Sequence, residues 1–307
     1  MGKIPVNIIS GFLGAGKTTA ILQLFSQKKT EDLWAVVINE FGKISIDSQT
    51  LRLNSPAGKV FDISGGCICC TAKAYLNETL EEIIQTGLYS RIIIEPSGLG
   101  GIDMVSEIVE LKSALLLKPV ICLVDILSLT NKRLQMNPVY QRQIVKSDQI
   151  VFTKTDLVLD VSELNELVAR FKTNFPAASI QANYTFDISL LDASINEKNT
   201  VKTNNTFKIV DPALSASNYL QKNCIFDADT IFDTKKIRKL LNEHNCIVRA
   251  KGFIQTSEGW KLLNYTLTQC VFENCEPGNQ NEIVIIADKS EPEFFENFDA
   301  EIVKSIL

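Results

Sequence analysis

The sequence is poor in histidine, with His244 as the one histidine among 307 residues. A Ser-His-Asp triad needs a histidine base beside its nucleophile, so most triad hydrolases are excluded. His244 ends a segment of helical pattern, and a lone histidine there is interpreted as a surface or capping residue. We also find no carboxylate pair of the kind that glycoside or peptide hydrolysis uses.

Long apolar runs and clusters of basic residues are absent as well. No stretch reaches the ~18 apolar residues of a membrane-spanning helix, and the apolar run at the N-terminus is too short for a secretory signal. The basic residues are scattered and the net charge is −5, which argues against binding to nucleic acid or to a membrane surface. We therefore expect a cytoplasmic protein without either partner.

Short apolar strands alternate with helical patterns through the first two thirds of the chain. The expected strands are 4–10, 34–39, 59–64, 91–95, 119–125, 149–156 and 178–182, and the expected helices are 17–27, 71–86, 103–115, 138–147 and 162–175. Strands that alternate with helices are typical of an α/β fold with a mainly parallel sheet covered on both faces.

A polar segment, SINEKNTVKTNNT at 194–206, separates this region from a different pattern. We interpret it as a linker between a P-loop domain at 1–193 and a smaller α+β domain at 207–307. In the second domain we expect apolar strand segments at 223–229, 246–255, 259–273 and 282–288, and helices at 233–244 and 292–306.

The segment GFLGAGKT at 11–18 matches G-x-x-x-x-G-K-[ST] between a strand and a helix, the context that a phosphate-binding loop requires. Its glycines let backbone N–H groups and the helix N-terminus surround phosphate oxygens. Lys17 is expected to reach the β- and γ-phosphates, and the Thr18 hydroxyl is expected to bind Mg²⁺.

Two apolar strands end in an acid. Glu95, in IIIEPSG, is our candidate for orienting Mg²⁺ or the attacking water, whereas Asp125, in LVD, is the weaker candidate. Glu40 is a second candidate for holding the water. The reaction is expected to be phosphoryl transfer to water, driven by positioning and charge neutralisation, with Lys17, Glu40 and Glu95 as catalytic residues.

The segment TKTD at 153–156 matches the [N/T]-K-x-D signature of guanine recognition. A carboxylate at Asp156 can accept both the N1–H and the exocyclic amine of guanine, and Lys154 would lie over the base. GTP is therefore favoured over ATP. The predicted nucleotide-binding residues are Gly11, Gly14, Ala15, Gly16, Lys17, Thr18, Thr19, Thr153, Lys154 and Asp156.

Three of the eight cysteines lie together in GGCICC at 65–70. Without a secretory signal we expect the cysteines to stay reduced. Thiolates at Cys67, Cys69 and Cys70 suit Zn²⁺ and leave a fourth position open, which favours transfer of the metal over a structural site. A redox pair within the cluster is the less favoured alternative.

Taken together, GFLGAGKTT, INEFGKISID at 38–47, GGCICC and TKTD resemble the CobW-type family of P-loop metallochaperone GTPases. This family is related to the GTPases that insert nickel into urease and hydrogenase. The resemblance, which includes RAKGFIQ at 249–255, implies GTP and GDP as ligands, zinc as cargo and an unknown client metalloprotein as partner. It also allows a homodimer.

The sequence departs from some family members at Ile38 and Lys43, where acidic residues can join in metal binding, and it lacks their histidine-rich loop. Without imidazoles, selection of nickel or cobalt by histidine has little support. Two alternatives stay open: a cobalt- or corrinoid-related accessory GTPase, and a nucleotide-gated zinc or redox sensor. In the favoured hypothesis, a zinc metallochaperone, the loop after 34–39 acts as a switch, so GTP binding is expected to alter zinc affinity.

Overall fold

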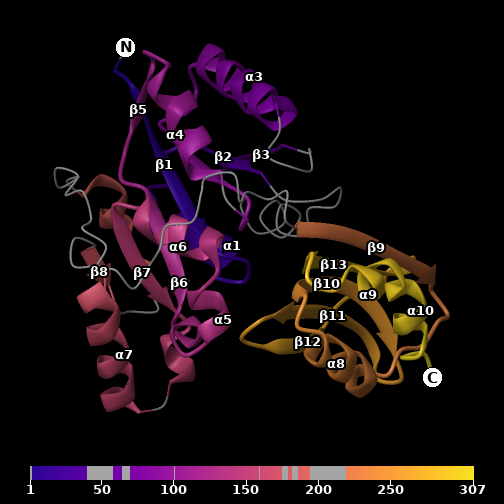
Figure 1. The fold of residues 1–307 in the computed structure, drawn as a ribbon. Helices are drawn as coiled ribbons and strands as arrows, with labels where there is room; N and C mark the ends of the chain where they lie inside the picture. The colour runs from indigo at the N-terminus through magenta and orange to yellow at the C-terminus, as the bar shows by residue number, and fades with distance from the viewer. Residues whose placement is uncertain are drawn as a thin grey trace. The chain divides into compact units, whose positions relative to one another are not determined.

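The computed structural model describes residues 2–39, 58–63, 70–99, 101–158, 160–174, 179–181, 186–193 and 219–307. The chain divides into two compact units, Met1–Ala216 and Ser217–Leu307 (Figure 1). The predicted linker at 194–206 lies outside the described residues, so the proposed domain boundary stays a prediction. No helix in the described part of the chain is both long enough and apolar enough to cross a membrane.

The N-terminal unit is built on an eight-stranded sheet whose described pairings are all parallel. The strands are β1 (Ile4–Gly11), β2 (Trp34–Ile38), β3 (Gly58–Asp62), β4 (Arg91–Glu95), β5 (Leu115–Leu117), β6 (Ile121–Asp125), β7 (Gln149–Thr153) and β8 (Ser179–Gln181). Their order is β3-β2-β4-β1-β6-β7-β8, with β5 paired to β1. The strand order changes direction at β1, and in such sheets ligands bind at the carboxyl ends of the strands at this point.

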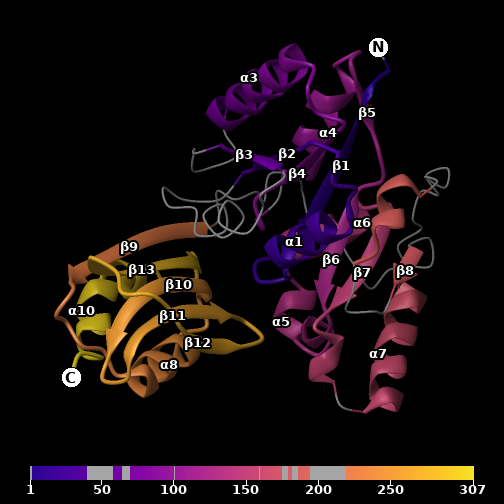
Figure 2. The same ribbon diagram turned by 180° about the vertical axis from the view of Figure 1, so that it is seen from behind.

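Successive side chains of the central strands enter two different cores. Ala35 and Val37 of β2 pack in the core formed with α3 (Cys70–Thr86) and α4 (Ile102–Glu110). Trp34 and Val36 pack in the opposite core, with α1 (Lys17–Gln27). This alternation explains why the strands are apolar throughout, because a parallel sheet is buried on both faces. Helices α3 and α4 lie side by side (Figure 2).

The remaining helices of this unit are short, apart from α7. They are η1 (Ile126–Leu129), α5 (Lys132–Gln135), α6 (Pro138–Val145), η2 (Thr155–Leu157), α7 (Val161–Asn174) and η3 (Ile188–Asp192). Helix α6 begins where the Asn137 side chain accepts hydrogen bonds from the backbone N–H groups of Val139 and Tyr140. Pro138 occupies its first turn, where the missing N–H carries no penalty.

The predicted α/β fold with a mainly parallel sheet is confirmed, but one helix is shorter than expected. The helix predicted over 103–115 ends at Glu110, and Leu115–Leu117 forms β5. The three leucines pair with Ile4, Pro5 and Val6 of β1. Pairing with a distant strand overrides the helical pattern in this segment.

The C-terminal unit is an antiparallel sheet of five strands in the order β12-β11-β10-β13-β9, which confirms the predicted α+β class. The strands are β9 (Tyr219–Asp227), β10 (Ile247–Thr256), β11 (Gly259–Thr266), β12 (Cys270–Asn274) and β13 (Gln280–Asp288), and the helices are α8 (Thr234–Glu243), α9 (Pro292–Glu296) and α10 (Phe298–Val303). The apolar run at 259–273 is a hairpin of two strands, and the helix predicted at 292–306 is two short helices. Side chains of α8 and α10 share one core with the sheet.

Candidate functional site

The loop between β1 and α1 is the predicted phosphate-binding loop, and three of its glycines have positive φ. Gly11, Gly14 and Gly16 have φ values of 145°, 81° and 87°, a region that other residues rarely adopt. A Cβ on Gly11 would also lie 2.6 Å from the carbonyl oxygen of Leu123 in β6. The glycines that the motif supplies are therefore required by the backbone itself. Helix α1 starts directly after Gly16, which has no side chain to cap the first N–H groups of the helix.

Lys17 is the first residue of α1, and its side chain is buried. Its Nζ donates a hydrogen bond to the Gly11 carbonyl oxygen at 3.1 Å and lies 3.9 Å from Oε1 of Glu95. Glu95 ends β4, which pairs with β1, and it is 5% exposed. The sheet therefore brings the lysine of the loop beside the strand-end acid. Thr18 is half-buried and Thr19 is exposed in the same first turn.

The loop after β4 packs tightly against the phosphate-binding loop. A Cβ on Gly98 would lie 2.7 Å from Cδ2 of Leu13 and 3.0 Å from its backbone nitrogen. Gln143 of α6, which is 2% exposed, holds this loop by donating a hydrogen bond from Nε2 to the Gly98 carbonyl oxygen at 3.0 Å. A movement of the segment after Glu95 would therefore displace Leu13.

The TKTD segment lies at the end of β7, two strands from β1. Thr153 donates a hydrogen bond from Oγ1 to the Ala15 carbonyl oxygen at 2.8 Å, so the first motif residue contacts the phosphate-binding loop. Lys154 has a φ of 57° and its Nζ lies 2.8 Å from Oδ2 of Asp125. Asp156, in η2, is exposed.

The remaining predicted residues lie outside what the structure describes. Glu40, Cys67 and Cys69 are not among the described residues, and Cys70 is the first residue of α3. Within the described ranges, no group of three or more histidine, cysteine or acidic side chains could hold a metal ion. The predicted zinc ligands therefore stay a prediction.

The five other cysteines are poor candidates for metal ligands. Cys122, Cys224 and Cys246 are buried, whereas Cys270 and Cys275 are partly exposed. Burial raises the pKa of Cys122 to about 12 and, together with a hydrogen bond to Asp299, raises that of Cys224 to about 12. A thiol with a raised pKa gives little of the thiolate that zinc binds.

Sequence reasoning did not find three contacts around this site. Gln143 carries no motif, and nothing in the sequence points to its contact with Gly98. Ser128 and Tyr140 also lack a signal, although their hydroxyl oxygens lie 2.7 Å apart within the fold. Asp125 had a signal in the sequence, namely its position at a strand end. That position did not indicate the contact with Lys154.

The comparison with protein families matches residues 5–181 to the CobW/HypB/UreG nucleotide-binding domain. The chain belongs to this family. The family assignment made from the motifs is thus confirmed, and the matched residues contain the loop after β1, Glu95 and the TKTD segment.

Relatives of this CobW/HypB/UreG chain include two proteins of Escherichia coli. The chain is 28% identical over 292 residues to the zinc chaperone YeiR, which covers 84% of this chain and 85% of YeiR. It is also 28% identical over 222 residues to the zinc chaperone YjiA, and this alignment covers 68% of this chain and 68% of YjiA. A crystal structure of Zn(II)-bound YjiA GTPase from E. coli covers 99% of each chain at 20% identity with a TM-score of 0.45.

Proposed function

We propose that this CobW/HypB/UreG chain binds GTP and hydrolyses it to GDP and phosphate. One observation carries the proposal: the loops after β1, β4 and β7 meet, through the approach of Lys17 to Glu95 and the hydrogen bond from Thr153 to Ala15. We expect Lys17 to contact the β- and γ-phosphates, and the glycine backbone and the N-terminus of α1 to bind phosphate oxygens.

The base would bind at the end of β7. Asp156 accepts the N1–H and the amine of guanine, while the stem of Lys154 covers one face of the ring. Thr153 holds this segment against Ala15, so the base pocket and the phosphate loop keep a fixed separation. An adenine base presents no paired donors of this kind to Asp156, and we therefore expect GTP to bind more tightly than ATP.

Thr18 and Glu95 would hold a magnesium ion. Both present oxygen ligands, which Mg²⁺ prefers, and they come from the first turn of α1 and the end of the neighbouring β4. The ion would supply positive charge to the phosphate oxygens. Lys17 adds to that charge from its position 3.9 Å from Glu95, and Glu40 or Glu95 orients the attacking water.

We further propose that Cys67, Cys69 and Cys70 bind zinc as cargo and that the chain delivers it to a client metalloprotein. The names of YeiR and YjiA as zinc chaperones support this cargo. The raised pKa values of Cys224, Cys270 and Cys275 make these thiols weaker candidates than the cluster. The cytoplasmic location and the homodimer stay predictions.

Release of the cargo requires that the two sites affect each other. Cys70 starts α3, whose core is shared with β4, the strand that ends at Glu95. GTP is therefore expected to change zinc affinity, and zinc must change GTP affinity by the same factor.

The test is an anaerobic zinc titration of the wild type and of a Cys67→Ala, Cys69→Ala, Cys70→Ala variant, with GDP and with a non-hydrolysable GTP analogue. A matched control replaces the partly exposed Cys270 and Cys275 by alanine. We expect the triple variant to lose zinc binding, the control to keep it, and the wild type to bind zinc with different affinity in the two nucleotide states.

The outcomes separate the alternatives. Equal zinc affinity with both nucleotides would exclude the switch. Tighter binding of cobalt than of zinc would favour the cobalt-related role, and absence of metal-stimulated GTP hydrolysis would favour a sensor.

A further inference from the structure

A buried ion pair joins the base-recognition segment to the neighbouring strand. Nζ of Lys154 lies 2.8 Å from Oδ2 of Asp125, and their side chains are 15% and 8% exposed. The pair forms because β6 and β7 are adjacent and parallel, with Asp125 opposite Thr153, the residue before Lys154. Lys154 is also the one non-glycine residue in the described part of the chain with positive φ.

The Asp125 carboxylate is itself held in place. Its Oδ1 accepts a hydrogen bond from the backbone N–H of Leu127 at 3.0 Å, which caps η1. Its Oδ2 faces Lys154. Because the two oxygens have separate partners, the carboxylate cannot rotate without losing one of them, and the lysine ammonium meets an acceptor whose orientation is fixed.

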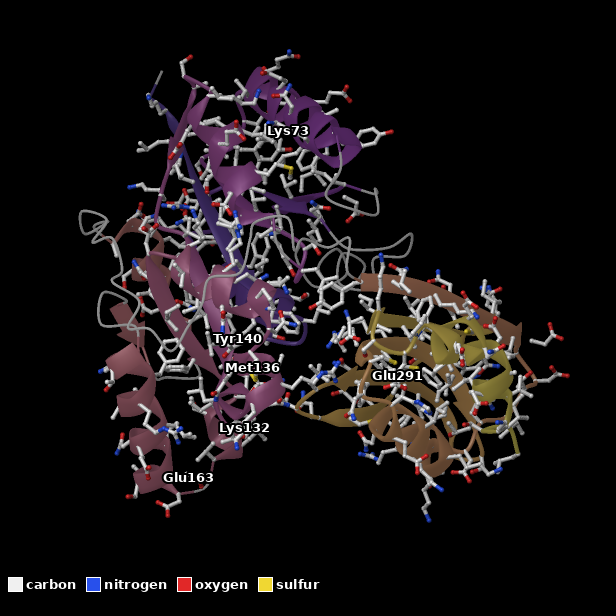
Figure 3. All side chains as sticks on the ribbon, in the orientation of Figure 1. Lys73, Lys132, Met136, Tyr140, Glu163 and Glu291 are labelled. Carbon is white, nitrogen blue, oxygen red and sulfur yellow. The ribbon has the colours of Figure 1, made fainter. Side chains whose placement is uncertain are left out.

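A chain of contacts links Asp125 to the phosphate-binding loop. Ser128 donates a hydrogen bond from Oγ to the Asp125 carbonyl oxygen at 2.5 Å, so the Tyr140 hydroxyl, 2.7 Å away, is the donor to Ser128. Burial raises the pKa of Tyr140, which keeps this donor protonated. Tyr140, which is labelled in Figure 3, belongs to α6. Its ring packs edge to face against the ring of Phe12, with 6.1 Å between the ring centroids.

We propose that Asp125 is a positioning residue for base recognition, which holds the Lys154 ammonium so that the lysine stem is already placed along the base. This inference rests on the proposed binding of guanine nucleotides by the TKTD segment. Lysine loses much rotamer freedom when it is ordered, and an ammonium anchored beforehand does not incur that loss on binding.

The same contacts argue against the catalytic role that a strand-end acid suggests. One Asp125 oxygen caps η1 and the other binds Lys154, whereas Glu95 is the strand-end acid beside Lys17. Removing the Asp125 charge should therefore weaken nucleotide binding through the base more than through the phosphates.

The test compares GDP and ADP affinity in the wild type and in Asp125→Asn. Asparagine keeps an oxygen that can cap η1 but loses the negative charge beside Lys154. We expect the GDP dissociation constant to rise about tenfold and that for ADP to change less than twofold, so the preference for guanine falls about tenfold. In a Lys154→Met background, Asp125→Asn should have no further effect.

The control variant is Asp103→Asn, which also removes one carboxylate charge, but from an ion pair with Arg142 and Lys146. It should leave the ratio of GDP to ADP affinity unchanged. If the wild type itself does not distinguish GDP from ADP, the proposed function fails. If the wild type prefers GDP and Asp125→Asn keeps the same preference, the positioning role is wrong.

A measurement on the wild type covers the case in which Asp125→Asn does not fold. Acetylation by acetic anhydride should label Lys154 at least tenfold more slowly than Lys239, whose side chain is 74% exposed, before any nucleotide is added. Equal labelling rates would show that Lys154 is not held and would overturn the inference.

Discussion

Oε1 of Glu95 lies 3.9 Å from Nζ of Lys17, and the two side chains are 6% and 10% exposed. Lys17 is the first residue of α1, which follows β1, and Glu95 ends β4, the parallel neighbour of β1. A carboxylate and an ammonium that are both removed from water depend on each other for charge compensation. One negative and one positive side chain therefore lie together where the predicted phosphate-binding loop ends and α1 begins.

Glu95→Gln should separate nucleotide binding from hydrolysis. The amide keeps the shape of the side chain but removes the charge proposed to act on Mg²⁺ and on the water. We expect kcat for GTP hydrolysis to fall about 100-fold or more, with GDP affinity within about threefold of the wild type. A phosphate-release assay with parallel GDP titration measures both. Unchanged kcat would remove Glu95 from the catalytic set.

Gly98→Ala should disturb the phosphate-binding loop from outside the motif. The new Cβ would meet Leu13 Cδ2 at 2.7 Å and the Leu13 backbone nitrogen at 3.0 Å. We expect a loss of about 1–3 kcal/mol in the free energy of unfolding and at least fivefold weaker GTP binding. Adding Leu13→Ala removes the closer contact and should restore part of the stability. Wild-type values in Gly98→Ala alone would contradict the close packing.

Asp156→Asn should change which base is bound. The asparagine amide presents a donor where the carboxylate accepted hydrogen bonds, which suits the second carbonyl group of xanthine. We expect GTP affinity to fall about 100-fold and XTP to become the better ligand. Asp160→Asn is the control, because Asp160 is an exposed aspartate four residues later in the chain and accepts a hydrogen bond from the backbone N–H of Ser162. GTP affinity that survives in Asp156→Asn would move base recognition elsewhere.

The buried thiol of Cys122 should make stability depend on alkaline pH. Burial raises its pKa from 9.0 to about 12, so between these values the unfolded chain loses the proton and the folded chain keeps it. The folded state then binds more protons, and the free energy of unfolding falls as pH rises through this window. Urea unfolding at pH 8 and pH 10.5 should show a decline about 1–2 kcal/mol smaller in Cys122→Ala than in the wild type. Equal declines would show that Cys122 does not titrate in this way.

Gly252→Ala should destabilise the C-terminal sheet. Gly252 lies in β10 opposite Ile283 of β13, and a Cβ there would lie 2.3 Å from the carbonyl oxygen of Glu282. Because the obstacle is backbone, relief requires the two strands to separate locally. We expect a loss of about 2–3 kcal/mol in the free energy of unfolding. Hydrogen exchange should locate faster exchange in β10 and β13, and exchange unchanged there would contradict the close approach.

Several features were predictable from the sequence because they are local. The glycines of GFLGAGKT indicated a tight turn of the backbone, and Gly11, Gly14 and Gly16 do have positive φ. The continuous apolar runs of the strands indicated a sheet buried on both faces. The position of TKTD at the end of a strand was also predictable, although the strand expected over 149–156 ends at Thr153 and Thr155–Leu157 forms η2.

The tertiary structure alone decided the contacts between segments far apart in the chain. The pair Asp125–Lys154 joins residues 29 positions apart, Gln143–Gly98 spans 45, and Thr153–Ala15 spans 138. Strand β5 likewise depends on β1, more than a hundred residues earlier. Local pattern reports which residues can form a strand or a turn, whereas the order of strands determines which side chains meet. The sequence therefore determined the kind of site, and the packing of β1, β4, β6 and β7 determined which residues complete it.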